Sequence, residues 1–372
     1  MEGKIKVLHR TATTGRGGVD RFVLNYYSHV DREKIQFDFM TRDRAFADAE
    51  DVKRMGMRVR TFTATEHDNK PLLAEQINGI LSDNYDILHM NTSVLSGLFI
   101  EERAMELGMK AVILHSHSTG VDFADSAKNE RYRRLHEHHK AMLSPRYATH
   151  FFACSKAAAD WMFGPQIPRE QIHIIKNAIE LEKFSYNCAV RERIRAAFGL
   201  QGKYVIGHVG RYTYQKNHEF LINVFARVHK RNGNAVLVLA GEGELAGNVG
   251  RQISEMGLES AVFQLGFCGN VHELLQGFDM FLLPSRFEGL SMVAIEAQAS
   301  GLPCVLSRNM TGETCVAPNA WRLPLDEDIW EQEIMRLMDT FTRENMDSYI
   351  IDSGYDICHA AKKLEDMYRA MV

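Results

Sequence analysis

Short apolar runs alternate with segments of helical spacing through the first half of the chain. The runs are bounded by turn residues, as buried strands of a parallel sheet are, and the segments between them place apolar residues three or four positions apart. The expected strands are KIKVLHR, FDFMTR, VRTFTA, YDILHMN, KAVILHS, ATHFFACS and IHIIKNAI. The segment TATTGRGGVDRFVLNYYSHV is expected to be a glycine-rich turn that runs into a helix, and further helices are expected over AEQINGILSDN, SVLSGLFIEERAMELG and SKAAADWMFG. This alternation predicts a parallel sheet covered by helices.

The same alternation restarts near residue 203. Its expected strands are KYVIGHVG, NAVLVLAG, AVFQLGF, DMFLL and CVL, with helices over 219–232, 245–256, 271–277 and 291–300. Residues 180–202 contain no strong strand pattern and are expected to connect the two halves. We therefore predict two α/β domains, residues 1–180 and 181–354, followed by an amphipathic helix in the tail GYDICHAAKKLEDMYRAMV.

Length and composition agree with two ordinary globular domains. The chain has 372 residues, of which 45% are hydrophobic and 25% charged. A net charge of −4 gives no support to a nucleic-acid-binding protein. The six cysteines form no C-x-x-C pair, and no apolar run approaches the roughly 20 residues of a membrane span. We also find no export signal, so a cytoplasmic location is expected.

The segment SRFEGLSMVAIEAQASGLPCVLS places two carboxylates in a region that otherwise has the pattern of a core. It predicts a loop after a strand, a helix that ends at Gly301, and the next strand. Glu288 then lies beyond the carboxyl end of the strand, and Glu296 lies about one turn into the helix. Carboxylates only accept hydrogen bonds, so the pair suits a ligand rich in hydroxyls. The alternatives are that Glu288 is a first-turn carboxylate favoured by the helix dipole and that Glu296 is a solvated helix position.

Two further loops follow strands. GRYTYQKNHEF places Arg211 and Lys216 just before a helix, where they suit a diphosphate leaving group or are ordinary surface cations. GRGGVD follows the first strand, and Gly17 and Gly18 would allow close backbone approach to a phosphate or form a plain tight turn. The GEG sequence at 241–243 is expected to be a turn.

Three polar clusters remain. His115 and His117 lie at the end of a strand of the first half, where each could be a ligand contact or a structural histidine. HEHHK, at 136–140, could bind a metal, but adjacent histidines point in different directions, so a helix face is preferred. DED, at 326–328, matches a metal-binding D-x-D, but its position before a helix predicts that Asp326 is an N-cap.

Taken together, these segments resemble the retaining glycosyltransferases of family 4. The resemblance lies in HVGRYTYQKNHEFLINVF, LVLAGEGEL and FQLGFCGNVHELLQGFDMFLLPSRFEGLSMVAIEAQASGLPCV, with the two glutamates matching the family's E-x7-E motif. GRGGVDRF, YDILHMNTSVLSG, VILHSHST, FFACSKAAADWMFG and IIKNAIELEKF resemble the subgroup that builds bacterial capsule and exopolysaccharide. The resemblance implies an α/β GT-B fold, with two Rossmann-like domains facing across a cleft. The first domain would bind the acceptor and the second the nucleotide-sugar, and a C-terminal helix, about 355–372, would return to the first domain.

The resemblance also implies roles for individual residues. The donor diphosphate would contact Arg211 and Lys216, and the ribose would contact Glu296. The donor sugar would contact Glu288, the backbone of Gly289, Leu290 and Ser291, and His117, which is preferred to His115. Gly17 and Gly18 would approach the phosphate, and no metal or other cofactor would be needed. One departure is NAIELEKF, where the family has Asn-Gly, so no role is carried over to Asn177.

The expected function is a hexosyltransferase of EC class 2.4. The donor would be a nucleotide-sugar, a UDP-sugar in preference to a GDP-sugar, and the acceptor a growing lipid-linked glycan of capsule or exopolysaccharide. The basic stretch RYRRLHEHHK, in the less acidic half of the chain, suggests peripheral contact with the anionic inner face of the cytoplasmic membrane. The alternatives are a sugar-nucleotide 2-epimerase of the same architecture, which needs a different acid–base set, and a non-catalytic glycan- or nucleotide-binding module.

Overall fold

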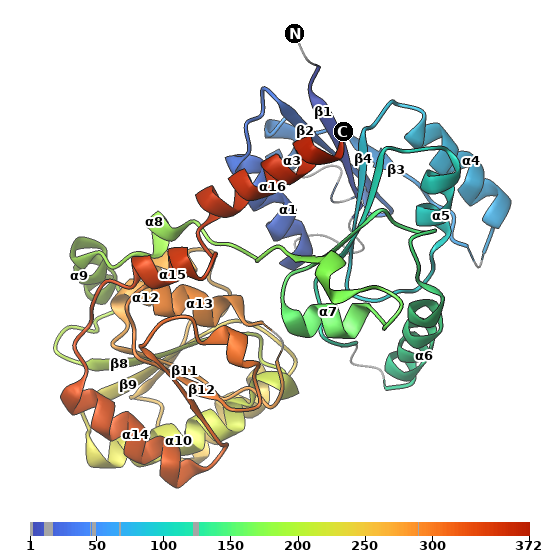
Figure 1. Ribbon diagram of the computed structural model, residues 1–372. Coiled ribbons are helices and arrows are strands. Elements are labelled where there is room, and N and C mark those ends of the chain that lie inside the picture. Colours follow the sequence, from blue (N-terminus) through green and yellow to red (C-terminus); the bar gives the residue numbers. More distant parts are fainter. Residues whose placement is uncertain are drawn as a thin grey trace. The chain divides into compact units, whose positions relative to one another are not determined.

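The chain divides into two units that are described separately. The computed structural model describes residues 3–10, 18–44, 46, 50–66, 68–121, 126–288 and 290–372. The N-terminal unit comprises Met1–Ala178 and Asp356–Val372, and the C-terminal unit comprises Ile179–Tyr355 (Figure 1). The C-terminal helix is therefore part of the N-terminal unit.

The N-terminal unit is a parallel sheet with helices on both faces. Its strands are β1 (Ile5–Arg10), β2 (Ile35–Thr41), β3 (Val59–Thr61), β4 (Ile87–Thr92), β5 (Ala111–Ser116), β6 (His150–Ala153) and β7 (Ile172–Ile174). They lie in the order β3-β2-β1-β4-β5-β6-β7, and every pairing is parallel. The helices are α1 (Gly18–His29), α3 (Glu50–Arg54), α4 (Lys70–Leu81), α5 (Phe99–Glu106), α6 (Ser126–Met142), α7 (Lys156–Met162), η1 (Arg169–Gln171) and α16 (Ile357–Met371).

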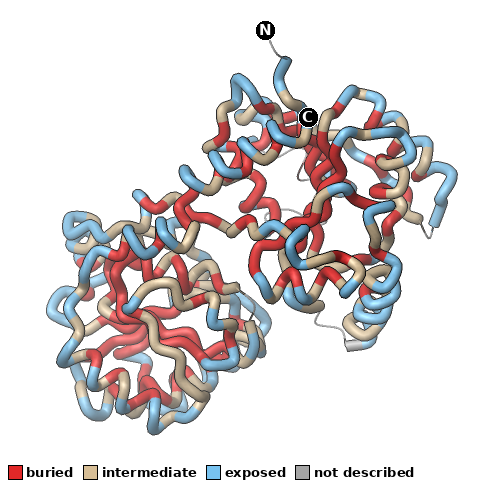
Figure 2. Tube along the Cα trace, viewed as in Figure 1, coloured by how far each residue is buried: buried red, intermediate tan, exposed pale blue. Residues whose placement is uncertain are grey.

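Successive strand residues point to opposite faces of this sheet and so build two cores. One core packs the sheet against α4, α5 and α7, and the other packs it against α1 and α16. Helix α16 belongs to the second core because Ile357, Ala361, Leu364 and Tyr368 form one buried stripe at helical spacing. Figure 2 shows buried residues along the strands and exposed residues on the outer sides of the helices.

The C-terminal unit repeats the architecture. Its strands are β8 (Tyr204–Val209), β9 (Ala235–Ala240), β10 (Val262–Gln264), β11 (Met280–Leu283), β12 (Cys304–Ser307) and β13 (Ala320–Leu323), in the parallel order β10-β9-β8-β11-β12-β13. Its helices are α8 (Leu181–Phe184), α9 (Cys188–Ala197), η2 (Tyr214–Lys216), α10 (His218–Arg231), α11 (Ala246–Glu255), α12 (Val271–Gly277), α13 (Met292–Ala299), η3 (Gly312–Thr314), α14 (Glu327–Thr340) and α15 (Asp347–Asp352). The segment 180–202, expected to be a connection, forms α8 and α9 of this unit.

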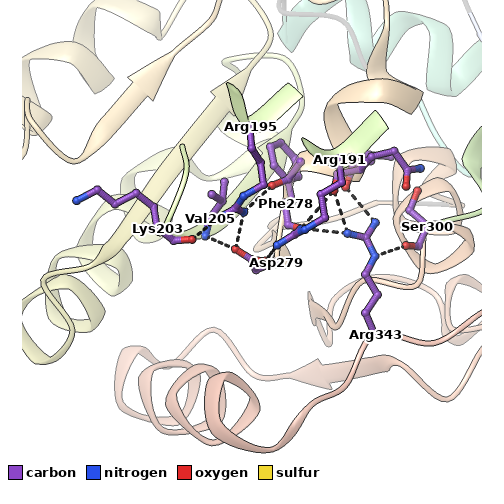
Figure 3. A network of polar contacts seen from close by, with 12 residues as sticks. Arg191, Arg195, Lys203, Val205, Phe278, Asp279, Ser300 and Arg343 are labelled. Atoms are coloured by element: carbon purple, nitrogen blue, oxygen red, sulfur yellow. Dashed lines mark hydrogen bonds and ion pairs between the residues drawn. The ribbon is translucent and has the colours of Figure 1, made fainter. Parts of the chain in front are cut away.

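A network of arginines around one carboxylate holds α9 against the start of β11 (Figure 3). Asp279 pairs with Arg191 and Arg195, and it also accepts from the Val205 backbone N–H at 2.7 Å. Arg343 lies beside this group and donates to backbone carbonyls at the end of α12. Burial, followed by the nearby Arg191, lowers the pKa of Arg343 to about 9. The network fixes the position of the first residues of β11, and the loop after the last residue of this strand forms part of the candidate site.

Candidate functional site

Two loops of the C-terminal unit meet at the point where the strand order reverses. Residues 210–216 follow β8, and residues 284–288 follow β11. Because these strands are parallel neighbours, with Ile206 opposite Met280, both loops leave the same edge of the sheet. The backbone N–H of Arg286 donates to the carbonyl of Gln215 at 2.8 Å and joins the loops.

The two loops bring Lys216 and Glu288 into contact. The Lys216 Nζ lies 2.6 Å from Glu288 Oε1, and the two side chains are only 12% and 13% exposed. The Ser285 hydroxyl donates to the other carboxylate oxygen, Oε2, at 2.8 Å. Glu288 is therefore neither a solvated residue nor a simple helix-dipole carboxylate, and Lys216 is not an ordinary surface cation. This close pair can present a cation to an anionic group and an acceptor to hydroxyls.

Neutral aromatic side chains surround the base of the Lys216 loop. His218 stacks on Tyr212 with ring centroids 4.3 Å apart, and its edge meets His208. Burial lowers the pKa of His218 to about 4, with a further contribution from the charge of Lys216. The pKa of His208 is lowered well below its usual value, again mainly by burial. These histidines are neutral at pH 7 and leave Lys216 as the cation of the group.

Two glycines hold the Arg211 loop in place, although the sequence suggested only a turn there. Gly241 has a φ of 145°, and a Cβ atom at this position would lie 2.0 Å from the carbonyl oxygen of Gly210. A Cβ on Gly243 would lie 2.5 Å from the carbonyl oxygen of Tyr212. Backbone hydrogen bonds accompany this approach, including one from Tyr212 N–H to the carbonyl of residue 242 at 3.0 Å. Only glycine permits such contact between two loops.

The other residues predicted to contact the nucleotide-sugar lie around the same loops. Arg211 is exposed, Leu290 and Glu296 are half-buried, and Ser291 is 2% exposed at the N-cap of α13. Gly289 lies outside the described residues. The Ser291 hydroxyl is buried and makes no hydrogen bond with a described group. Glu296 occupies the second turn of α13, as the sequence predicted.

The glycine turn of the first half is only partly described. Gly17 lies outside the described residues, and Gly18 is the exposed first residue of α1. A Cβ atom on Gly18 would meet nothing within 4 Å, so no described contact requires glycine at this position. Its approach to a phosphate stays a prediction.

Two of the polar clusters have structural roles. The Asp326 carboxylate accepts from the backbone N–H groups of Asp328 and Ile329, which confirms the predicted N-cap of α14. His136 accepts from Leu95 N–H at 3.1 Å and stacks on Trp161 at 3.9 Å. Across the described ranges, no group of three or more His, Cys, Asp and Glu side chains could hold a metal ion.

A buried column of histidines runs under the predicted sugar contact of the N-terminal unit. His9 stacks on His89 and His89 on His115, while Tyr368 of α16 places its hydroxyl 2.6 Å from His89 Nδ1. His89 Nε2 lies 3.0 Å from His115 Nδ1. His115 is fully buried in this column, and its ring lies 4.0 Å from that of the partly exposed His117.

Asn91, which sequence analysis did not single out, determines the tautomer of His117. The Asn91 amide nitrogen faces the carbonyl oxygens of Arg10 and His89 at 3.3 and 3.2 Å, so this end must be the donor. The amide oxygen then faces His117 Nε2 at 3.0 Å and only accepts. His117 therefore carries its proton on Nε2, and Nδ1 is an acceptor.

His117 is also neutral. Burial lowers its pKa to about 3. Its backbone N–H donates to the carbonyl of Thr92 at 3.0 Å. Its Nδ1 is buried and has no hydrogen-bond partner among the described groups.

Comparisons with known proteins identify the family of the chain. Residues 16–183 match the family model Glycosyltransferase Family 4, and residues 190–332 match the model Glycosyl transferases group 1. The chain is 32% identical to the putative glycosyltransferase EpsF of Bacillus subtilis, across 98% of this chain and 96% of that protein. It is 28% identical to an Escherichia coli UDP-Gal:alpha-D-GlcNAc-diphosphoundecaprenol alpha-1,3-galactosyltransferase, over 54% of this chain and 55% of that one.

A solved structure shows the same fold. Anabaena HepE in complex with UDP superimposes with a TM-score of 0.74 at 19% identity, covering 98% of this chain and 97% of HepE. The two parallel-sheet units, the two matching family models and the nearly full-length similarity to EpsF lead to one assignment. This chain belongs to the family 4 glycosyltransferases, with the GT-B fold, and is a glycosyltransferase.

Proposed function

We propose that the protein transfers a hexose from a UDP-sugar to a growing glycan, with retention of the anomeric configuration. The observation that carries this proposal is the Lys216–Glu288 pair at the strand-order reversal of the C-terminal unit. It offers a cation for a diphosphate next to an acceptor for sugar hydroxyls. The presence of UDP in the HepE complex and the UDP-Gal donor in the name of the E. coli relative support the choice of nucleotide.

The proposed roles are those that the family resemblance implies. Arg211 and Lys216 hold the diphosphate, Glu296 accepts from the ribose, and Glu288 accepts from the donor sugar. His117 contacts the same sugar near the reacting carbon. The remaining contacts come from the backbone of Gly17, Gly18, Gly289, Leu290 and Ser291.

The chemical step needs no protein nucleophile. The bond from the anomeric carbon to the diphosphate oxygen breaks, and a bond to the acceptor oxygen forms on the same face of the sugar. The acceptor hydroxyl gives its proton to the departing phosphate. Arg211 and Lys216 stabilise the negative charge that grows on the diphosphate, which is an effect larger in the transition state than in the ground state. We propose that the reaction is independent of a metal ion.

We further propose a lipid-linked acceptor of capsule or exopolysaccharide synthesis and peripheral contact with an anionic membrane. The diphosphoundecaprenol in the name of the E. coli relative supports a lipid-linked acceptor. None of the described helices is long and apolar enough to cross a membrane. The candidate surface is α6, whose Arg131, Arg133 and Arg134 are exposed, although the last two pair with Glu130. Replacing the three arginines by Ala should reduce sedimentation with anionic vesicles; unchanged sedimentation would contradict the contact.

One experiment separates this function from its alternatives. The protein is incubated with a panel of sugar nucleotides and a glycan acceptor, and the nucleotides are separated by chromatography. A glycosyltransferase releases nucleoside diphosphate in an acceptor-dependent manner. A 2-epimerase would instead produce a second sugar nucleotide, and a non-catalytic binding module would leave the panel unchanged.

A further inference from the structure

A cavity of about 520 Å³ lies in the C-terminal unit, beside the first turn of α10 and along α11. We call it the α10–α11 cavity. Its volume falls in the range of small-molecule sites. None of the described residues proposed to contact the donor lines it, although Tyr214, which does, belongs to the same turn η2 as Lys216. The cavity is therefore a neighbour of the donor loops with walls of its own.

Buried polar atoms without partners gather in the residues that line this cavity. Five such atoms make no hydrogen bond with a described group: Thr213 Oγ1, Asn217 Oδ1, His218 Nδ1 and Nε2, and Arg286 Nε. Asn217 and His218 are only 4% and 3% exposed. Most buried polar groups in proteins have a partner, so a group of unused atoms along one wall is typical of a functional surface rather than of a packed core.

The charges that line the α10–α11 cavity balance. Two arginines, Arg251 and Arg286, are matched by two glutamates, Glu219 and Glu255. Arg286 lies 3.6 Å from Glu219, and burial lowers the pKa of His218 to about 4, so this ring adds no charge at pH 7. A phosphate or a nucleoside diphosphate would find no excess of positive charge here. The balance favours a neutral polar ligand.

The polar side chains of α11 suit hydroxyl groups. Asn248 Oδ1 accepts from Arg251 at 2.7 Å, so the amide N–H groups of Asn248 stay available to a ligand. Gln252 has the opposite arrangement, because its amide nitrogen donates to the Glu219 carbonyl at 3.1 Å while its oxygen accepts from no described group. The Glu255 carboxylate is exposed and makes no ion pair with a described residue. This wall offers both donors and acceptors, and a sugar hydroxyl both accepts and donates.

An aromatic ring adds a platform to the cavity. Tyr214 is 64% exposed, and the guanidinium carbon of Arg286 lies over its ring at 4.5 Å from the centroid. The C–H groups of a pyranose pack on an aromatic face, because the negative π-face of the ring attracts their weakly positive hydrogens. Leu245 and Val249 contribute apolar surface to the same cavity. A saccharide carries both the C–H faces and the hydroxyls that these walls match.

We propose that the α10–α11 cavity binds a neutral saccharide, at a site separate from the donor loops. The proposed transfer reaction assigns no role to α11 or to Tyr214, so this site is an additional carbohydrate contact of the C-terminal unit. Tyr214 and Lys216 share η2, and the backbone N–H of Arg286 joins the two donor loops through the carbonyl of Gln215. A saccharide bound in the cavity therefore rests on the same segments that carry the Lys216–Glu288 pair.

The test is saturation-transfer NMR with a panel of neutral disaccharides of glucose, galactose, mannose and N-acetylglucosamine, in saturating UDP to occupy the donor loops. At least one disaccharide should bind the wild type, and its titration gives the affinity. Tyr214→Ala should weaken the binding of that disaccharide roughly tenfold, because the aromatic contact is lost. Asn248→Ala/Glu255→Ala, which changes only exposed residues of α11, should weaken it roughly 5- to 50-fold through the loss of hydrogen bonds.

The matched control is Tyr186→Ala, because Tyr186 is another exposed tyrosine of the C-terminal unit that lies under an arginine, Arg343, at 4.2 Å. This variant should keep the wild-type affinity for the disaccharide. The proposal is overturned if no disaccharide of the panel binds, or if either Tyr214→Ala or Asn248→Ala/Glu255→Ala binds as tightly as the wild type. Loss of the disaccharide signal on addition of UDP would also overturn it, because the disaccharide would then occupy the donor loops. A wild type that fails to bind UDP would instead contradict the proposed donor, and the same titrations without UDP would still report on the cavity.

Discussion

Replacing Glu288 by Gln should tighten the binding of UDP while abolishing most sugar transfer. Lys216 and Glu288 are in contact at 2.6 Å, so an incoming diphosphate must share Lys216 with an anion already present. Glu288→Gln keeps the shape of the side chain and removes that competing charge. The freed cation is largely buried, which makes a new anionic partner more favourable than it would be in water.

The magnitude follows from the charge-assisted hydrogen bond between the two side chains. Such a bond contributes about 1.5–3 kcal/mol, which corresponds to a factor of roughly 10 to 150 in affinity. Because both side chains keep a little solvent contact, we expect Glu288→Gln to tighten UDP binding by about tenfold. Lys216→Met should weaken UDP binding by about 10- to 150-fold and should lower kcat as well as raise KM, since charge on the diphosphate grows during transfer.

Isothermal titration with UDP and a turnover assay with the donor sugar nucleotide test this reasoning together. Glu219→Gln is the matched control, because it removes one negative charge three residues from Lys216 on a side chain that is 75% exposed. Its UDP affinity should match the wild type. Glu296→Gln should weaken UDP binding through loss of the ribose contact. A Glu288→Gln variant that loses UDP affinity as Glu296→Gln does would refute the division of roles between the two glutamates.

Three further predictions concern the surroundings of the site. Gly243→Ala places a Cβ 2.5 Å from the carbonyl oxygen of Tyr212, so the Arg211 loop must shift and the affinity for UDP should fall by about tenfold or more. Gly247→Ala, whose Cβ would meet nothing within 4 Å, should bind UDP as the wild type does, and equal UDP affinities in the two variants would contradict the glycine argument. The pKa values of His9 and His117 are about 3 in the folded protein against an ordinary value of 6.5, so the unfolded chain binds more protons below pH 6.5 and stability should fall with decreasing pH. The free energy of unfolding should fall by at most about 4 kcal/mol for the two histidines between pH 6.5 and 5. In urea unfolding, a His117→Gln variant should lose less stability over this pH range than the wild type, and an equal loss would show that His117 does not cause the pH dependence. Transfer should survive EDTA, and a loss of turnover that Mg²⁺ or Mn²⁺ restores would show that a metal is required.

The order of elements was accessible from the sequence because it depends on local patterns. Apolar runs and helical spacings lie within single segments, and each parallel strand carries the signal of its own burial. The N-cap at Asp326 and the left-handed residue at Gly301, with a φ of 72°, are also local. The positions of Arg211 and Glu288 followed from the rule that loops after parallel strands gather at one edge of the sheet.

The contacts within the site depend on residues that are distant in the sequence. Lys216 and Glu288 are 72 positions apart, and which of their atoms meet depends on the relative placement of β8 and β11. The close approach of Gly243 to Tyr212 likewise joins two loops through their backbones, and a turn signal in a sequence does not say what the turn packs against.

The N-terminal unit shows the same limit. His9, His89 and His115 each look like an isolated strand residue, and only the register of β1, β4 and β5 stacks them under His117. Asn91 controls the tautomer of His117 through carbonyls on two strands. The sequence by itself therefore determined the α/β architecture and predicted the candidate loops after β8 and β11. The tertiary structure decided which side chains are paired, neutral or left without partners, because register and burial arise from packing between segments that no local pattern records.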